Sequence, residues 1–254
     1  GILTLLIQLE IILKTQERGF FRDDNSISKP YDEEAEFPTV LVAVVTVVSP
    51  LIIFALVEIV SLIRLRYIDK YQFKRSPLLI ASNIFHTSLI FLSGYLFTMF
   101  VFVVLRNRLG TLRPDFLSRC KPDFSSLRPG TLWITPEIQS RICTGDSDVI
   151  LEGRKSSPSG HALGSAFCTI FAAFSLSRLN SRILSTNLVS IIQFTLVVFG
   201  VVTSVTRATD NFHRGSELVV GYVLGAISAF YYEFKVRRKH IVPLDQILYD
   251  PKQL

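Results

Sequence analysis

Two arginines with a spacing suited to binding phosphate lie in the segment RNRLGTLRP, residues 106–114. Arg106 and Arg113 are separated by about two helical turns, so a helix over this segment would present both side chains on one face. Each guanidinium group can direct a fork of N–H donors at phosphate oxygens. The alternative for Arg106 is a side chain that merely snorkels to the interface at the end of an apolar stretch.

A serine, a glycine and a histidine lie together in a second segment, SSPSGHALGSAF, residues 156–167. Ser159 and Gly160 precede a predicted helix, and the backbone N–H groups at a helix N-terminus point at a bound anion. His161 then lies in the first turn, beside that anion. The alternative is an ordinary helix cap followed by a histidine with no chemical role.

A third segment, TRATDNFHRGSE, residues 206–217, contains a further arginine and a histidine–carboxylate pair. Arg207 comes first, then His213, then Glu217 four residues later. Side chains at positions i and i+4 share a helix face. The carboxylate can then fix the imidazole tautomer and leave the other ring nitrogen able to attack an electrophile. Such pairs also arise by chance, which is the alternative here.

Long apolar stretches separate these three segments. Hydrophobic residues make up 49% of the 254 residues, and several blocks approach or exceed the ~20 residues needed to cross a bilayer. Six stretches are candidate membrane spans: residues 2–13, 38–63, 78–105, 162–177, 188–205 and 218–232. We therefore expect an all-α, polytopic membrane protein with about six transmembrane helices and a single domain over residues 1–254. Since the chain opens with Gly1 and its one methionine is Met99, we expect the first span to be truncated.

The charges of the loops orient these helices. Lys and Arg are dense in residues 64–75, 178–182 and 235–239, whereas residues 23–36 are rich in Asp and Glu. The positive-inside rule places the basic loops in the cytoplasm. Residues 106–157 are basic as well, but a loop this long is translocated largely regardless of its charge. All three chemical segments then meet at the non-cytoplasmic ends of the helices, where we expect a lumenal or extracellular active site.

Together the three segments resemble the signature of the type 2 phosphatidic acid phosphatase superfamily, the lipid phosphate phosphatases. That signature reads K-x6-R-P, then P-S-G-H, then S-R-x5-H-x3-D. The matching residues are Arg106, Arg113 and Pro114, then Pro158 to His161, then Thr206, Arg207, His213 and Glu217. The segments LRPDFLSRC and EGRKSSPSGH also resemble the eukaryotic phosphatidate and lysophosphatidate phosphatases. Three positions depart from the signature: Arg106 replaces Lys, Thr206 replaces Ser, and Glu217 replaces Asp.

The resemblance implies a phosphoric monoester hydrolase that uses neither a metal ion nor another cofactor. It implies that His213 attacks phosphorus and becomes phosphohistidine, that Glu217 orients His213, and that His161 protonates the departing oxygen. The residues expected to bind the phosphate group are Arg106, Arg113, Arg207, Ser159 and Gly160. The implied substrate is a lipid phosphate held in the bilayer, such as phosphatidate, lysophosphatidate or a related lipid (pyro)phosphate.

Two alternatives use the same residues. One is a polyprenyl or dolichyl diphosphate phosphatase. The other is a weakly active or inactive relative that binds lipid phosphate, which Glu217 in place of Asp favours. A soluble haloperoxidase with these motifs is excluded by the apolar spans. The net charge of +6 does not favour a nucleic-acid partner, because the basic residues flank apolar spans. We expect a multi-pass protein of the endoplasmic reticulum, Golgi, vacuole or plasma membrane.

Cys120 and Cys143 both lie in the long loop 106–157. If this loop faces an oxidising compartment, the two thiols can pair. We therefore predict a disulfide between them, with two unpaired thiols as the alternative.

Overall fold

The structure, a computed structural model, describes residues 12–31, 39–63, 76–177, 185–209 and 211–237. It is mostly helical, as predicted. The long helices are α2 (Thr39–Ile63), α3 (Ser76–Leu109), α7 (Gly160–Leu176), α8 (Thr186–Thr209) and α9 (Gly215–Tyr231), which continues into the π-helical turn η5 (Tyr232–Arg237). The short elements are β1 (Phe20–Phe21), η1 (Asn25–Ile27), α4 (Phe116–Cys120), η3 (Phe124–Ser126), β2 (Trp133–Ile134), α5 (Pro136–Ile142) and α6 (Ser147–Gly153).

Five of the six predicted spans coincide with the five long helices. Two of these helices are long and apolar enough to cross a membrane, over residues Ala81–Leu109 of α3 and Thr186–Thr206 of α8. Shorter apolar helices cover Thr46–Val60 and Gly160–Leu176. The first predicted span, residues 2–13, lies almost entirely outside the described residues. The count of six spans therefore stays a prediction.

The chain forms two compact units. The first consists of Gly1–Thr39, Met99–Leu163 and Thr203–Val223, and the second of Val40–Thr98, Gly164–Val202 and Leu224–Leu254. The boundaries fall at the first residue of α2 and within α3, α7, α8 and α9. Every residue predicted to form the site belongs to the first unit.

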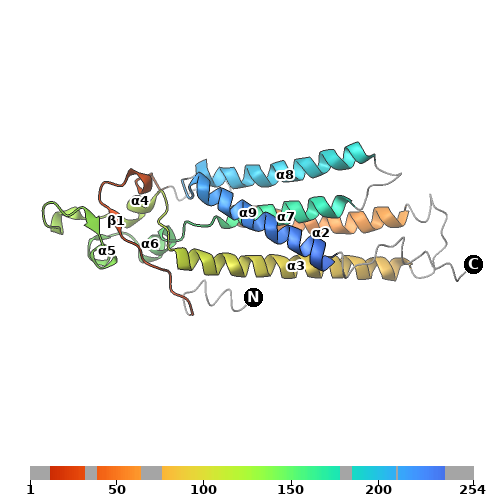
Figure 1. The fold of residues 1–254 in the computed structure, drawn as a ribbon, viewed down its shortest axis with the longest axis horizontal. Helices are drawn as coiled ribbons and strands as arrows, with labels where there is room; N and C mark the ends of the chain where they lie inside the picture. The colour runs from red at the N-terminus through yellow and green to blue at the C-terminus, as the bar shows by residue number, and fades with distance from the viewer. Residues whose placement is uncertain (1–11, 32–38, 64–75, 178–184, 210, 238–254) are drawn as a thin grey trace, which may run out of the picture. The chain divides into compact units, whose positions relative to one another are not determined.

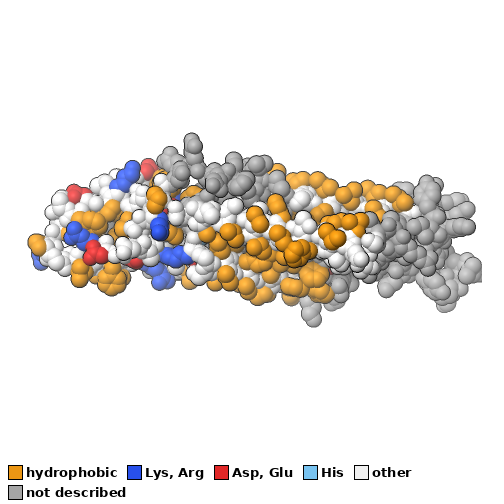
Figure 2. All heavy atoms as spheres, turned by 90° about the horizontal axis from the view of Figure 1, so that it is seen from above, with side chains coloured by type: hydrophobic (Ala, Val, Ile, Leu, Met, Phe, Trp, Pro, Cys, Tyr) orange, Lys and Arg blue, Asp and Glu red, His pale blue; other side chains and the backbone are white. Residues whose placement is uncertain are grey.

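The second unit has an aromatic core and an apolar exterior. Phe54, Phe91 and Phe171 are buried, and their ring centroids lie 5.3–5.5 Å apart in edge-on or tilted pairs. Large hydrophobic side chains also face outward, among them Phe194, which is 71% exposed, and Phe85, which is 63% exposed. In Figure 2, hydrophobic side chains gather over the helices of the face in view. Helices that are apolar inside and outside suit a hydrocarbon environment.

The first unit contains a small core built from the loop elements. Figure 1 shows α4, α5 and α6 gathered with β1 beyond the C-terminal end of α3. β1 pairs antiparallel with β2, with Phe20 opposite Ile134. The buried residues of this core are Phe20, Ile27, Leu112, Phe116, Cys120, Ile134 and Ile142. Because Leu112 and Phe116 belong to this core, it holds in place the loop that directly follows α3.

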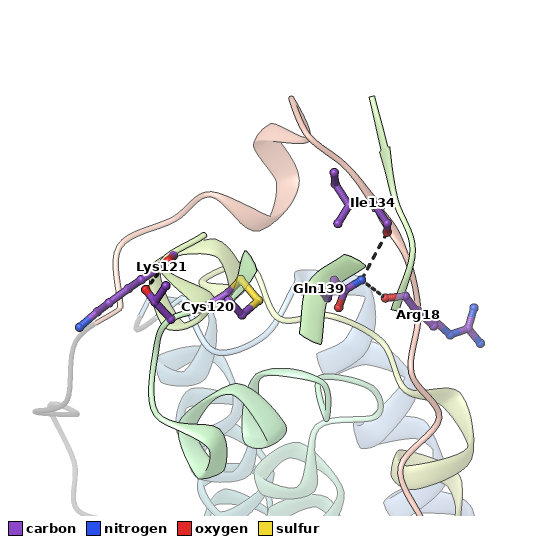
Figure 3. Close-up of a disulfide and its surroundings, with 7 residues drawn as sticks. Arg18, Cys120, Lys121, Ile134 and Gln139 are labelled. Carbon is purple, nitrogen blue, oxygen red and sulfur yellow. Dashed lines mark hydrogen bonds between the residues drawn. A yellow bond between two sulfur atoms is a disulfide. The ribbon is translucent and has the colours of Figure 1, made fainter. Parts of the chain in front are cut away.

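The predicted disulfide between Cys120 and Cys143 is confirmed. It joins the end of α4 to the end of α5 (Figure 3). Beside it the buried amide of Gln139 donates to the backbone carbonyls of Arg18, at 2.7 Å, and Ile134, at 3.4 Å. These bonds tie the segment before β1 to α5. The long loop is therefore a folded structure with its own core and cross-link.

Candidate functional site

The first arginine pair does not lie on one helix, so that prediction was wrong. α3 ends at Leu109 because Gly110 adopts a left-handed backbone with φ of +54°, a conformation that glycine takes at helix C-termini at little cost. The N–H of Gly110 donates to the carbonyl of Arg106 at 3.2 Å. Arg106 therefore lies in the last turn of α3, and Arg113 lies in the loop that follows.

The two arginines nevertheless converge on one carboxylate. Arg106 Nη1 lies 3.2 Å and Arg113 Nη2 lies 3.1 Å from the same oxygen, Oε1 of Glu152 in α6. Lys155 Nζ lies 3.8 Å from the other oxygen, Oε2. Each arginine side chain is 11% exposed and that of Lys155 is 4% exposed, whereas that of Glu152 is 42% exposed. Three largely buried cations thus face one partly exposed anion.

Burial affects the charge and the hydrogen bonding of this pair. Desolvation lowers the pKa of Arg113 to about 10, and the charge of Glu152 offsets part of that effect, so Arg113 keeps its charge at neutral pH. The Nε atoms of Arg106 and Arg113 are buried and have no hydrogen-bond partner among the described residues. One carboxylate oxygen therefore leaves donors of both guanidinium groups unsatisfied, as expected of a site made for an anion with more oxygens.

The segment before α7 has the arrangement predicted for an anion site. α7 begins at Gly160, so His161 lies in its first turn. The hydroxyl of the buried Ser159 is 3.5 Å from the N–H of Ala162, the pattern of a helix N-cap. A Cβ atom on Gly160 would come within 2.6 Å of the Phe102 ring. Gly160 is therefore required for α7 to start this close to α3.

The start of α7 also packs closely against α9. A Cβ atom on Gly221 would lie 2.5 Å from the carbonyl oxygen of Ser159. The N–H of Ser159 donates to the backbone carbonyl of Glu217 at 3.3 Å. This contact joins the second and third segments of the predicted site.

His213 lies in the loop before α9 and is buried, with 7% of the residue exposed. Its Nδ1 atom is 2.7 Å from the backbone carbonyl oxygen of Ser156. A carbonyl can only accept, so Nδ1 carries the proton and Nε2 presents a lone pair. Burial lowers the pKa of His213, Glu217 offsets this in part, and the charge of Arg113 lowers the pKa further. The imidazole is thus kept neutral, which is the form of a nucleophile.

Glu217 occupies the first turn of α9, but it does not share a helix with His213, because α9 begins at Gly215. The prediction of a pair on one helix face was therefore wrong. Its Oε2 atom lies 3.7 Å from His213 Nδ1. It accepts shorter bonds from the Ser156 hydroxyl, at 2.6 Å, and the N–H of Arg214, at 2.9 Å. The bond to Arg214 is that of a capping box, in which the third helical residue satisfies the cap N–H.

Ser156 therefore orients the imidazole through its carbonyl and holds Glu217 through its hydroxyl. Ser156 lies within the second of the three segments, but no role was predicted for it. Glu152, Lys155 and Arg214 were missed as well. The guanidinium group of Arg214 contacts Glu217, at 3.3 Å, and the carbonyl of Leu112, at 2.9 Å.

Two links join the cation cluster to the histidine. Arg113 lies over the ring of Phe212, with 5.4 Å between its Cζ atom and the ring centroid, and Phe212 directly precedes His213. Glu152, Lys155 and Ser156 follow one another within five residues of chain. Arg207 lies in α8, but its side chain falls outside the described part of the structure. Among the described residues there is no cluster of three or more His, Cys, Asp or Glu side chains that could hold a metal ion.

Comparison with known proteins identifies the family of the chain. The chain is 28% identical to mouse phospholipid phosphatase 1 over 84% of its length and 72% of the mouse protein. It is 27% identical to mouse phospholipid phosphatase 2 over 88% of its length and 77% of that protein. No solved structure matches the chain. The family model described as the PAP2 superfamily matches residues 87–239, a range that contains all three motifs. The resemblance drawn from the motifs is confirmed, and the chain belongs to the PAP2 superfamily.

Proposed function

We propose that this chain is a membrane lipid phosphate phosphatase that hydrolyses phosphatidate, lysophosphatidate or a related lipid phosphate through a phosphohistidine at His213. The observation that carries the proposal is the hydrogen bond from His213 Nδ1 to the carbonyl of Ser156, at 2.7 Å. It fixes the tautomer in which Nε2 can attack phosphorus. The similarity to proteins named phospholipid phosphatase supports a lipid phosphate as the substrate.

The reaction proceeds in two displacements. His213 Nε2 forms a bond to phosphorus while the bond from phosphorus to the lipid oxygen breaks, and His161 gives a proton to that oxygen. Water then attacks the phosphohistidine, His161 takes a proton from it, and the nitrogen–phosphorus bond breaks to release inorganic phosphate. The first displacement leaves His161 neutral, as the second requires. The second displacement frees His213 and protonates His161, as the first requires.

The charges near phosphorus stabilise both transition states. Arg106 and Arg113 bind the phosphate oxygens on this proposal, and Arg207 is expected to join them. The Ser159 hydroxyl and the Gly160 N–H add donors at the start of α7. Glu217, 3.7 Å from His213 Nδ1, stabilises the positive charge that the imidazole gains when it bonds to phosphorus. With these arginines around the phosphate, the reaction requires no metal ion.

The lipid class follows from a site at the ends of apolar helices, where a phosphate headgroup can enter while the acyl chains stay in the bilayer. On this proposal residues 1–254 form a single multi-pass domain with about six spans. Its active site then faces the lumen of the endoplasmic reticulum, Golgi or vacuole, or the outside of the cell.

A phosphate-release assay over a panel of lipids tests the function. Purified protein in mixed micelles is given phosphatidate, lysophosphatidate, a sphingoid phosphate and a polyprenyl diphosphate, with and without excess EDTA. We expect release from a lipid monophosphate that is unaffected by EDTA and abolished by His213→Ala. Release only from the diphosphate would favour the polyprenyl alternative, and no release from any lipid would favour an inactive lipid-phosphate-binding relative. A requirement for a divalent ion would contradict the mechanism.

A further inference from the structure

Glu152 is an anion placed on the cations that the proposed reaction needs. Its Oε1 atom accepts from Arg106 at 3.2 Å and from Arg113 at 3.1 Å, and its Oε2 atom lies 3.8 Å from Lys155. A phosphate oxygen bound by the arginine pair would have to share or take over the contacts that Glu152 now makes. The side chain of Glu152 and the phosphate of the substrate are therefore rivals for the same donors.

The geometry indicates that a phosphate group satisfies the N–H donors of the two arginines better than the Glu152 carboxylate does. Oε1 takes one N–H from each arginine, and the two buried Nε atoms have no partner among the described residues. A phosphate group with three non-bridging oxygens offers more acceptors and, when fully ionised, twice the charge of a carboxylate. The side chain of Glu152 is 42% exposed, so it can turn toward solvent while the more deeply buried arginines remain in place.

We propose that Glu152 is a specificity-determining residue: its carboxylate competes with the substrate for Arg106 and Arg113, so that the site takes dianionic phosphomonoesters and rejects singly charged phosphoryl groups. The inference rests on the phosphatase function proposed above. A singly charged group gains no Coulombic advantage over a tethered carboxylate of the same charge, whereas a dianion does. Glu152 thereby sets the charge that a ligand must carry in order to enter.

The variant Glu152→Gln tests this directly, because its amide oxygen can still accept from the arginines but its charge is gone. We expect KM for a lipid monophosphate and the inhibition constant of inorganic phosphate at pH 7.5 both to fall by about tenfold, with kcat changed less than about threefold. The tenfold factor corresponds to an unliganded protein in which Glu152 leaves Arg106 and Arg113 about one tenth of the time, because the apparent affinity for substrate is reduced by that fraction.

The pH dependence separates competition from a general gain in affinity. A phosphomonoester loses its second charge below a pKa of about 6, so KM of the wild type should rise steeply between pH 7.5 and pH 5, by about tenfold. In Glu152→Gln it should rise by less than about threefold. Among the described residues, the charged groups that face Glu152 are Arg106, Arg113 and Lys155, and all three are present in both proteins. His161 and His213 affect both proteins alike, so the ratio of the two KM values reports on Glu152.

Asp148→Asn is the matched control. Asp148 is an exposed residue of the same helix, α6, and its loss removes the same charge without touching the arginines. It should leave KM and its pH dependence unchanged. An equal effect in both variants would show that KM responds to the net charge of α6 and not to the contact with the arginines, and would overturn the proposal. A raised KM or a lost kcat in a folded Glu152→Gln protein would overturn it as well.

Glu152→Asp keeps the test falsifiable if the glutamine variant does not fold. Its carboxylate is drawn back by one methylene, so KM should fall in the same direction by a smaller factor. If neither variant folds, Glu152 is a structural residue and the proposal is wrong. Failure of the phosphatase function itself is distinguishable, because then the wild type releases no phosphate from any lipid.

Discussion

Glu217→Gln tests the electrostatic role of the carboxylate beside the nucleophile. Since His213 Nδ1 bonds to the Ser156 carbonyl at 2.7 Å, the reactive tautomer survives in this variant. The amide oxygen of Gln can still accept from the Ser156 hydroxyl and the Arg214 N–H. What is lost is a negative charge 3.7 Å from Nδ1. A pair of unit charges about 4 Å apart interacts by about 4 kcal/mol at an effective dielectric constant of about 20.

Because the imidazole carries only part of its charge in the transition state, we expect a loss of about 3 kcal/mol, or about two orders of magnitude in kcat. KM should change little, since Glu217 does not contact the phosphate. The assay is steady-state phosphate release from the best lipid of the panel. Ser156→Ala is the control: it removes a hydroxyl donor but keeps both the carbonyl and the carboxylate, and should cost less than about tenfold in kcat. Near-normal kcat in Glu217→Gln, or an equal loss in the control, would refute the reasoning.

Three other predictions concern the arginine pair, the ionisation of the nucleophile and the disulfide. Arg113→Lys should lower kcat/KM at least about tenfold more than Arg106→Lys. Each arginine lies over a ring, but the ring under Arg113, Phe212, directly precedes His213, whereas the ring under Arg106, Phe102, belongs to α3. A lysine cannot reproduce the planar contact that holds Arg113 beside the nucleophile, and equal losses would contradict this. Because burial lowers the pKa of His213, a histidine-selective NMR titration assigned with His213→Asn should show an apparent pKa below the ordinary value of about 6.5. Below about pH 6.5 the imidazole of His213 takes up a proton in the unfolded state but not yet in the folded state, so the free energy of unfolding should fall as the pH drops below about 6.5. A raised pKa of His213 would contradict the burial argument. Cys143→Ser should lower the free energy of unfolding by about 3 kcal/mol, the loop-entropy contribution of a cross-link over about 24 residues, measured by denaturant titration; an unchanged midpoint would show that the loop core alone holds the segment.

The long helices could be predicted from the sequence because each of them is a long block of apolar residues. The predicted span 188–205 corresponds to α8 (Thr186–Thr209), and 218–232 corresponds to α9 (Gly215–Tyr231). Blocks of apolar residues this long leave few alternatives to a helix. The end of α3 was misjudged although its signal was present: a glycine after a helical run is a common stop, and Gly110 ends the helix before Arg113.

The contacts within the site could not be read in this way. Motif spacing identified the residue types, but the partner of His213 is a backbone carbonyl 57 residues away in the chain. The acceptor shared by the arginines, Glu152, is 46 residues from Arg106 and 39 from Arg113. Neither contact follows from a periodic pattern, because each depends on how α6 and the loop before α7 pack. A carboxylate near three basic residues is also common in a basic loop, so Glu152 carried no distinctive signal.

Phosphorylation of His213 during turnover is the step on which the mechanism depends, and trapping the intermediate tests it most directly. Protein mixed with lipid carrying radiolabelled phosphate is quenched in alkaline denaturant within one turnover, digested, and analysed by mass spectrometry. The mechanism predicts an acid-labile, alkali-stable label on the peptide that contains His213, present in the wild type and absent in His213→Ala. A label on another residue, or phosphate release by the wild type without any labelled protein at any time, would contradict it.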